Sequence, residues 1–129
     1  MKDETTRERG KRGEDAAAAY LTAHGCTVVA RNVRLGHGEI DLIAEDGTRL
    51  LFVEVKTRME PVGGVYRFGR PAAAVTLEKQ RRIISAAGEY LRLHPSALMP
   101  RLDVCEVLLS RKDGSVLSLS YLPGAFRKR

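Results

Sequence analysis

Residues 38–56 read GEIDLIAEDGTRLLFVEVK and contain two apolar runs separated by Asp46 and Gly47. An Asp-Gly pair between runs of alternating apolar residues is a strong signal of a two-residue β-hairpin turn. We therefore predict two antiparallel strands, at 39–45 and 49–56. A turn of that length predicts the cross-strand pairs Glu45–Thr48, Ile43–Leu50, Asp41–Phe52 and Glu39–Glu54.

The charged side chains of this hairpin are predicted to share one face of the sheet. Side chains alternate between the two faces of a strand, so one side carries Glu39, Asp41, Glu54 and Lys56. Asp41 and Glu54 become diagonal neighbours, roughly 7–8 Å apart at the backbone. Ionised groups in a buried sheet are costly unless they are paired or bind a metal, so this hairpin is the predicted functional site. The opposite face is apolar, with Ile40, Leu42, Ala44, Leu51, Val53 and Val55.

The chain has 129 residues, of which 43% are hydrophobic and 29% are charged. These values predict one domain, residues 1–129, that buries about two thirds of its unfolded surface. No apolar run is long enough to span a membrane and the first residues do not resemble a signal peptide, so we expect a cytoplasmic protein without a membrane partner. Cys26 and Cys105 have no CxxC spacing and are expected to be reduced thiols. The histidine spacing argues against a structural zinc site.

Positive charge is concentrated in one part of the sequence. The net charge is +6 and the isoelectric point is near 9.7, which favours an anionic partner. Between residues 58 and 82 the acidic residues are Glu60 and Glu78, against a larger basic set. We predict that this set follows a nucleic-acid backbone, although charge alone supports a role in solubility equally well. The predicted nucleic-acid-binding residues are Arg58, Arg67, Arg70, Lys79, Arg81 and Arg82.

The remaining pattern predicts the order α-β-β-β-α-β-β, an α/β fold with a mixed central sheet and a helix on each side. Residues 1–9 and 124–129 are expected to be flexible, and 58–75 to form a long basic loop. The inner stripe of the second helix is predicted to be Leu77, Gln80, Ile84, Ala87 and Leu91. Besides the hairpin, the predicted elements are helices at 11–24 and 76–93 and strands at 27–33, 102–109 and 116–122.

Glu14 occupies an unusual position on the first predicted helix. It lies one turn before the apolar stripe formed by Ala17, Ala18 and Leu21. A carboxylate on that stripe faces the sheet and needs a cationic partner there. The alternative is that the Glu14 carboxylate interacts favourably with the positive end of the helix dipole at the N-terminus, which contributes roughly 0.3–1 kcal/mol.

The helix and strands that carry these carboxylates resemble the PD-(D/E)xK nuclease superfamily. GEIDLIA at 38–44 and FVEVKTR at 52–58 resemble more closely a family of small bacterial proteins named for YraN. That family is similar to archaeal Holliday junction resolvases, and its members are predicted endonucleases. Ile40 stands where the superfamily name has a proline. Further matching positions are Gly13-Glu14-Asp15, Arg31-Asn32, Lys79 and Arg101–Val104.

The resemblance implies a restriction-endonuclease-like fold and a metal-dependent endonuclease that hydrolyses phosphodiester bonds in DNA, with branched or otherwise structured DNA among the candidate substrates. It implies that Asp41, Glu54 and the carbonyl of Val55 hold Mg²⁺ or Mn²⁺. Lys56 would orient the attacking water or help to deprotonate it. Glu14 would bind through water or hold a second ion.

Two alternatives remain open on the sequence. Asp41, Glu54 and Lys56 can form a cross-strand salt bridge on a solvated face, worth about 0.2–1 kcal/mol. The protein can also be a non-catalytic nucleic-acid-binding protein that keeps the nuclease fold. Lys79 is either a contact to the scissile phosphate or a solvated lysine. The sequence leaves open DNA against RNA as the partner, and it leaves a homodimer open.

Overall fold

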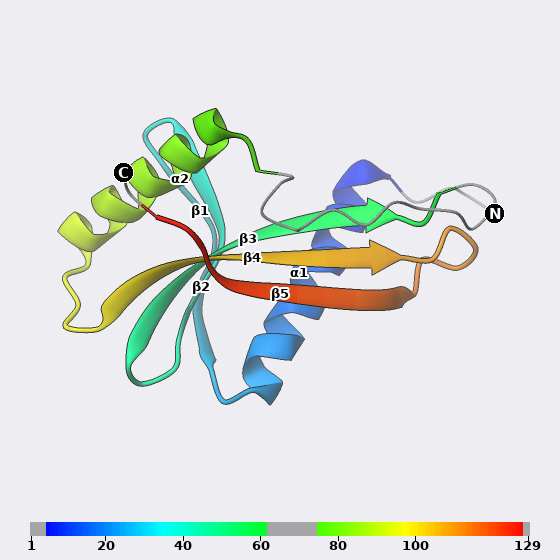
Figure 1. Ribbon diagram of the computed structural model, residues 1–129, viewed down its shortest axis with the longest axis horizontal. Helices are drawn as coiled ribbons and strands as arrows, with labels where there is room; N and C mark the ends of the chain where they lie inside the picture. The colour runs from blue at the N-terminus through cyan, green and yellow to red at the C-terminus, as the bar shows by residue number, and fades with distance from the viewer. Residues whose placement is uncertain (1–4, 62–74, 128–129) are drawn as a thin grey trace.

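A computed structural model describes residues 5–61 and 75–127. Five strands form one sheet in the order β1-β2-β3-β4-β5, with one helix against each face (Figure 1). The predicted order α-β-β-β-α-β-β and the mixed sheet are confirmed. The elements are α1 (Thr6–Ala23), β1 (Thr27–Leu35), β2 (Gly38–Glu45), β3 (Arg49–Met59), α2 (Leu77–Leu93), β4 (Met99–Leu109) and β5 (Val116–Phe126).

The sheet is antiparallel except at its centre. β1–β2, β2–β3 and β4–β5 are antiparallel pairs, whereas β3 and β4 run parallel from Arg49↔Met99 to Met59↔Leu109. A parallel pair requires a crossover connection, and α2 lies within it. Neither described helix is long and apolar enough to cross a membrane.

Each helix covers its own part of the core. On one face, Ala17, Ala18 and Leu21 of α1 pack against an apolar surface that includes Leu42 and Val53, so the predicted stripe of this helix is confirmed. On the other face, α2 covers a second group that contains Ile40, Ile43, Leu50 and Phe52.

The predicted inner stripe of α2 is partly wrong. Leu77 is 50% exposed, whereas Ile83 and Ala86, which lay outside the predicted stripe, are buried. The end of β5 explains the difference, because Phe126 packs with Ile83 and Val104 and so fixes which side of the helix faces inward. That contact joins residues far apart in the sequence, so the spacing of apolar residues along the helix cannot predict it.

The predicted hairpin is present, but its register differs by two residues. Asp46 Oδ1 accepts hydrogen bonds from the backbone N–H groups of Thr48 and Arg49 at 2.9 and 2.7 Å, which stabilises a longer turn than the predicted one. The observed pairs are Leu42↔Val53, Ile43↔Phe52, Ala44↔Leu51 and Glu45↔Leu50. A shift of two residues keeps each side chain on its face, and one further step places Asp41 opposite Glu54.

Several predicted boundaries are also corrected. The side chain of Thr5 caps α1 by accepting from the N–H of Glu8 at 3.1 Å, so residues 6–9 are helical although they were expected to be flexible. β3 continues to Met59, and β5 includes residues 124–126, which were predicted to be loose. The rest of the predicted basic loop, 62–74, lies outside the described residues.

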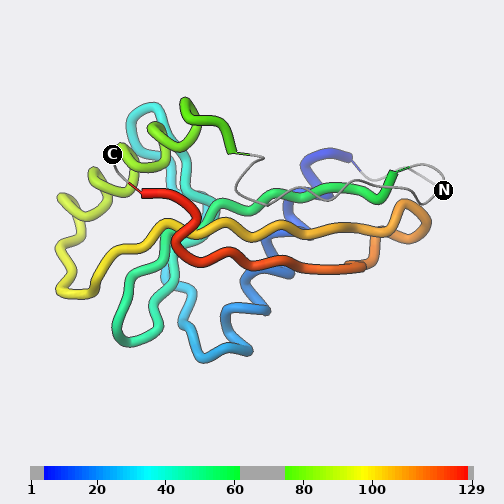
Figure 2. The backbone as a smooth tube through the Cα atoms, in the orientation of Figure 1, coloured from blue at the N-terminus to red at the C-terminus, as the bar shows by residue number. Residues whose placement is uncertain are grey.

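Asp103 holds the end of β5 in place. Its buried carboxylate accepts from the side chain of Arg101 at 2.8 and 3.1 Å, from the hydroxyl of Tyr121 at 2.5 Å and from the N–H of Gly124 at 2.8 Å. Gly124 has a φ of +60°, a left-handed conformation that glycine adopts without strain. From this point the chain turns toward α2 (Figure 2), which places Phe126 against that helix.

Gly13 permits α1 to approach β3 closely. A Cβ added at Gly13 would lie 1.8 Å from Thr57 Oγ1 and 3.0 Å from Thr57 Cβ, so any larger residue forces the helix away from the strand. Glu14 is the next residue, so this contact also sets how near its carboxylate comes to the sheet.

We expect Gly13→Ala to lower the free energy of unfolding by about 1–3 kcal/mol, because overpacking exceeds the gain in helix propensity of at most about 1 kcal/mol. Thr57→Ala should restore part of that loss in the double variant. The control is Gly10→Ala on the same helix, where an added Cβ meets no atom within 4 Å, and which should be mildly stabilising. Chemical denaturation gives the free energy of unfolding of the unsubstituted protein, Gly13→Ala, the double variant and Gly10→Ala. A stabilising Gly13→Ala would contradict the close contact.

Candidate functional site

The site begins at a break in the regular pattern of β1 and β2. Asn32 has a φ of +51°, and it is the non-glycine residue with positive φ in the described part of the chain. The pairs Arg31↔Leu42 and Val33↔Ile40 place Asn32 opposite Asp41. Ile40 packs toward α2 whereas Leu42 packs toward α1, so β2 changes face at Asp41. The prediction that Ile40 and Leu42 share a face is therefore wrong, because the left-handed residue rotates the paired strands.

Asn32, Asp41 and Glu54 lie in one row across β1, β2 and β3. Asp41 is half-buried, and its Oδ2 accepts a hydrogen bond from the backbone N–H of Val55 at 2.7 Å. Glu54 is only 4% exposed. The structure thus brings the two predicted carboxylates together on neighbouring strands, closer than the predicted diagonal arrangement.

The two carboxylates affect each other's protonation. Burial, together with the negative charge of Glu54, raises the pKa of Asp41 to about 8, although the hydrogen bond from Val55 acts in the opposite direction. Near neutral pH, Asp41 therefore retains a proton when no cation lies beside the pair. A bound cation would act against that shift, because a nearby positive charge favours the ionised carboxylate.

Glu54 has one paired oxygen and one unpaired oxygen. Lys79 Nζ lies 2.9 Å from Glu54 Oε1, and it comes from the first turn of α2. Glu54 Oε2 is buried and accepts no hydrogen bond from an N–H group or hydroxyl of residues 5–61 and 75–127, so a proton on Asp41 or a cation is left to compensate it. An unsatisfied buried acceptor costs about 1–3 kcal/mol, and more when it is charged. The unpaired oxygen marks a place where a cation would be stabilising.

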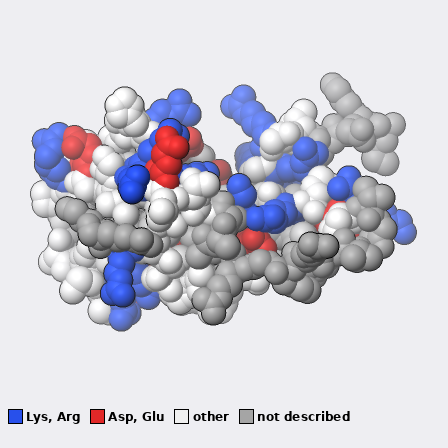
Figure 3. Space-filling model, turned by 45° about the horizontal axis from the view of Figure 1, so that its top comes forward, with Lys and Arg blue, Asp and Glu red and all other residues white. Residues whose placement is uncertain are grey.

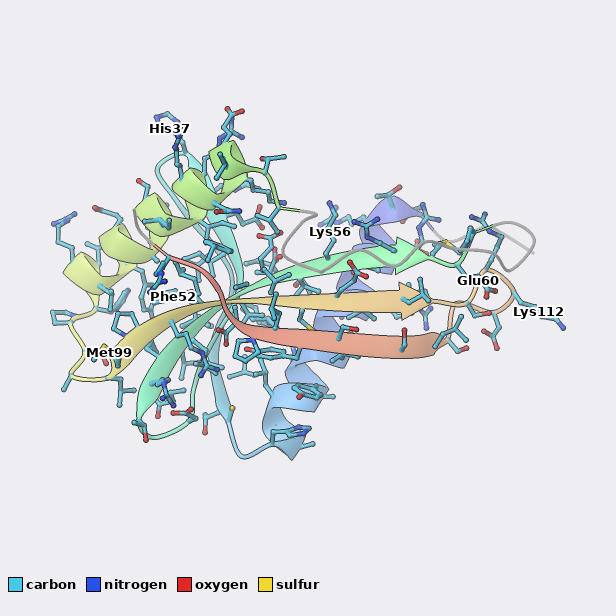
Figure 4. All side chains as sticks on the ribbon, in the orientation of Figure 1. His37, Phe52, Lys56, Glu60, Met99 and Lys112 are labelled. Atoms are coloured by element: carbon cyan, nitrogen blue, oxygen red, sulfur yellow. The ribbon has the colours of Figure 1, made fainter. Side chains whose placement is uncertain are left out.

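Lys56 is on the same strand as Glu54, two residues later. By strand alternation its side chain leaves β3 on the face of Glu54, and Figure 4 shows it projecting away from β4. It is half-buried, and no described carboxylate lies within ion-pair distance of its ammonium group. The alternative of a cross-strand salt bridge that joins Lys56 to Asp41 and Glu54 is therefore absent from the described residues, where Lys79 is the partner of Glu54.

Glu14 approaches the pair from α1. Burial is the main cause that raises its pKa, and the side-chain amide of Asn32 acts against it. Glu14 also adds to the negative potential at Asp41. However, within the described ranges no three acidic, histidine or cysteine side chains converge closely enough to enclose one ion. Asp41 and Glu54 thus form a pair of neighbouring carboxylates, and Glu14 does not complete a three-residue cluster with them in the described part of the chain.

The predicted basic residues have different surroundings. Arg58 pairs with Glu106 at 3.2 Å and Arg82 with Glu78 at 2.6 Å, and Arg81 is exposed on α2. Figure 3 shows lysine and arginine surface interspersed with separate small acidic areas. Arg67 and Arg70 lie outside the described residues.

The sequence alone did not indicate the positions that two residues, Asn32 and Lys79, occupy beside the predicted site. Asn32 belongs to the Arg31-Asn32 match with the family, but no role was predicted for it. An asparagine inside a predicted strand is the feature that could have identified it, because asparagine tolerates a left-handed backbone. Lys79 was predicted to be either a contact to the scissile phosphate or a solvated lysine, whereas its ammonium group contacts Glu54 in the structure. Glu39 is exposed and pairs with Arg34 at 3.5 Å. His37 lies at the tip of the β1–β2 turn (Figure 4).

The comparisons with known proteins identify relatives over most of the chain. Residues 13–107 match the uncharacterised protein family UPF0102. A UPF0102 protein of Symbiobacterium thermophilum is 52% identical over 103 residues, covering 79% of this chain and 83% of the relative. One from Dictyoglomus turgidum is 41% identical over 121 residues, covering 93% and 98%. The predicted resemblance to the YraN-like family is thereby confirmed.

Among solved structures, the Holliday junction resolvase Hjc of Archaeoglobus fulgidus matches with a TM-score of 0.47 and 17% sequence identity. The match covers 94% of this chain and 79% of the resolvase.

The raised pKa of Asp41 predicts how stability changes with pH in the presence of a chelator. A carboxyl whose folded pKa is raised from 3.8 to about 8 stabilises the fold while protonated, and that contribution is lost as pH rises through 8. Asparagine resembles the protonated acid. The melting temperature of Asp41→Asn relative to the unsubstituted protein should therefore increase by roughly 5 °C or more from pH 6 to pH 9.

The control for this experiment is Asp46→Asn, because hydrogen bonds from Arg49 and Thr48 lower the pKa of that exposed carboxyl. Its melting temperature should stay at a constant offset from the unsubstituted protein over the same range. Parallel curves for Asp41→Asn would show that Asp41 is ionised throughout.

Proposed function

This chain belongs to the UPF0102 family, and we propose that it is a divalent-metal-dependent nuclease that hydrolyses phosphodiester bonds in DNA. The observation that carries the proposal is the buried Oε2 of Glu54 beside Asp41, which has no hydrogen-bond partner among the described residues. The same strand presents Lys56, whose ammonium group has no ion pair with a described carboxylate. Branched or otherwise structured DNA remains the candidate substrate.

The donor set fits a hard divalent cation. Mg²⁺ and Mn²⁺ prefer carboxylate and carbonyl oxygens and keep several waters. Asp41 and Glu54 would supply two carboxylates. The N–H and C=O of one strand residue point to the same side, and the N–H of Val55 points at Asp41, so its carbonyl oxygen also faces this position. When bound, the cation would lower the pKa of a coordinated water and polarise a phosphoryl oxygen.

Lys56 supplies a positive charge that no described carboxylate neutralises. It lies one strand repeat from Glu54, about 7 Å along the chain, so its ammonium group can reach a phosphate or an attacking water without binding the cation. There it would orient the water and offset negative charge on the phosphate. Glu14 would act from α1 through a water molecule or hold a second ion.

The basic residues would provide affinity for the substrate backbone. Of the described ones, Arg58, Arg81 and Arg82 are exposed, and Lys79 is half-exposed beside the carboxylates. Charge neutralisation of phosphates supplies most sequence-independent affinity. Arg67 and Arg70 remain part of the proposed surface.

The alternative is a nucleic-acid-binding protein that retains the fold without catalysis. One observation favours it: the ammonium group of Lys79 already neutralises part of the charge on Glu54. In that case a metal would not be required, and the protein would bind DNA without cutting it.

Supercoiled, linear and four-way-junction DNA, each with Mg²⁺, Mn²⁺ or a chelator, distinguish the two functions. We expect cutting only with metal, and Lys56→Ala should lose at least about a hundredfold in rate while still binding metal and DNA. Lys112→Ala is the matched control, because it removes the same charge at the distant turn between β4 and β5 (Figure 4).

Retarded migration of DNA without cutting would favour the binding protein. Cutting by folded Lys56→Ala at the rate of the Lys112→Ala control would refute the role assigned to Lys56. Melting temperatures of both variants show whether a lost activity reflects unfolding.

A further inference from the structure

We propose that Lys79 exchanges partners: it is the counter-ion of Glu54 while the site holds no cation, and it moves to a phosphate of the nucleic acid when a cation binds. The exchange makes the cation and the nucleic acid bind cooperatively, so the site fills with metal most readily on its substrate. This inference rests on the proposed metal-dependent function and adds a form of regulation to it.

The ion pair between Lys79 and Glu54 is the first observation. Lys79 Nζ lies 2.9 Å from Glu54 Oε1, and this carboxylate is only 4% exposed. Its Oε2 accepts no hydrogen bond from an N–H group or hydroxyl of residues 5–61 and 75–127. The ammonium group therefore lies beside the negative charge that a divalent cation would bind. Two cations at one carboxylate repel each other, so Lys79 opposes binding of the cation in the free protein.

The two partners of this ion pair differ in their freedom to move. Glu54 is buried in β3, which has a neighbouring strand on each side. The side chain of Lys79 is 47% exposed, and a lysine has a flexible four-carbon stem that can turn outward while its helix stays in place. The exchange thus requires the motion of one side chain.

The start of α2 fixes the backbone from which Lys79 extends. The N–H of Lys79 donates a hydrogen bond to Thr76 Oγ1 at 3.1 Å, which caps the helix. The side-chain amide of Gln80 donates to the carbonyl oxygen of Val75 at 3.0 Å, and Val75 is buried in the core. Because this turn is anchored, the ammonium group of Lys79 can leave Glu54 and still remain next to the site.

The position of Lys79 in the helix favours an anion as its second partner. A lysine is unfavourably placed in the first turn, because the positive end of the helix dipole lies there. Glu54 compensates that charge in the structure, and a cation bound to Glu54 would remove the compensation. A phosphate would restore it, since anions are favoured at this end of a helix. Arg82, one turn later on the same side, is exposed and can contact the same backbone.

The exchange predicts a reciprocal coupling between two ligands. A nucleic acid that pairs with Lys79 raises the affinity of the site for the cation, and the cation raises the affinity for the nucleic acid by the same factor. A lysine that only holds Glu54 in place predicts the opposite effect on the metal. In that case its removal would loosen the carboxylate and weaken cation binding.

The experiment compares Lys79→Met with Lys112→Met, which makes the same substitution at the exposed, distant turn between β4 and β5 (Figure 4). Methionine keeps the helix propensity of lysine and removes the charge. The melting temperature of Lys79→Met in chelator should fall by roughly 4 °C or more, because Glu54 loses its partner. Lys79→Gln keeps a hydrogen-bond donor for Glu54 without the charge, and it replaces Lys79→Met if that variant does not fold.

Calorimetry without DNA gives the dissociation constant of Mn²⁺ for each protein. We expect Lys79→Met and Lys79→Gln to bind Mn²⁺ about tenfold more tightly than the unsubstituted protein, because a competing positive charge is gone. Lys112→Met should stay within about twofold, since solvent and salt screen a distant charge.

A four-way-junction DNA with phosphorothioate linkages, which keep the negative charge and resist hydrolysis, tests the second partner. Its dissociation constant is measured at fixed ionic strength with Mn²⁺ or with chelator. In chelator, Lys79→Met should match Lys112→Met within about twofold, because Lys79 is then held by Glu54. With Mn²⁺, Lys79→Met should bind at least about fivefold more weakly, and its logarithmic salt slope should be smaller by about 0.9, as for one lost phosphate contact.

Unchanged or weaker Mn²⁺ binding by the Lys79 variants would overturn the proposal. A loss of DNA affinity that is the same with Mn²⁺ and with chelator would also overturn it, because Lys79 would then contact phosphate whether or not the site is filled. If none of the proteins binds Mn²⁺, the proposed function itself fails. That result is distinct from equal affinities among proteins that do bind Mn²⁺, which would refute the exchange alone.

Discussion

Asp41 and Glu54 lie opposite each other on two buried strands, and the negative charge of such a pair has to be neutralised. The N–H of Val55 and the ammonium group of Lys79 compensate part of that charge. Burial and the negative charge of Glu54 raise the pKa of Asp41 to about 8, which favours a proton there near neutral pH. Among the described residues, Oε2 of Glu54 has no hydrogen-bond partner. A buried arrangement of this kind lowers stability, so its presence in the centre of the fold favours a functional explanation over a structural one.

The surrounding elements are arranged around this pair. The left-handed residue Asn32 rotates β1 and β2 so that Asp41 faces the site, and Gly13 lets α1 approach β3 next to Glu14. On the other side, α2 begins beside the carboxylates and brings Lys79 to Glu54. Gly38 packs against this helix, where an added Cβ would lie 2.3 Å from the carbonyl oxygen of Arg82. Small residues thus bring both helices close to the strands that carry the site.

Much of this site was predictable from local sequence patterns. Alternation placed Asp41 and Glu54 on one face, and that conclusion survived an error of two residues in register because the side-chain period is two. The partner of Glu54 was not predictable in this way, because Lys79 is separated from it by 25 residues and the contact depends on how α2 docks. The same holds for the buried side of α2, which Phe126 fixes from the end of the chain. The rotation at Asn32 depends on a single backbone angle that the alternating pattern does not encode.

A crystal structure with Mn²⁺ would test the central claim most directly, through the anomalous scattering of the ion. We expect one peak about 2.1 Å from an Asp41 oxygen, from Glu54 Oε2 and from the carbonyl oxygen of Val55. Crystals of Asp41→Asn grown under the same conditions should lack the peak. A fully occupied Mn²⁺ ion bound elsewhere, with no peak at the Asp41–Glu54 pair and with Lys79 still paired with Glu54, would contradict it.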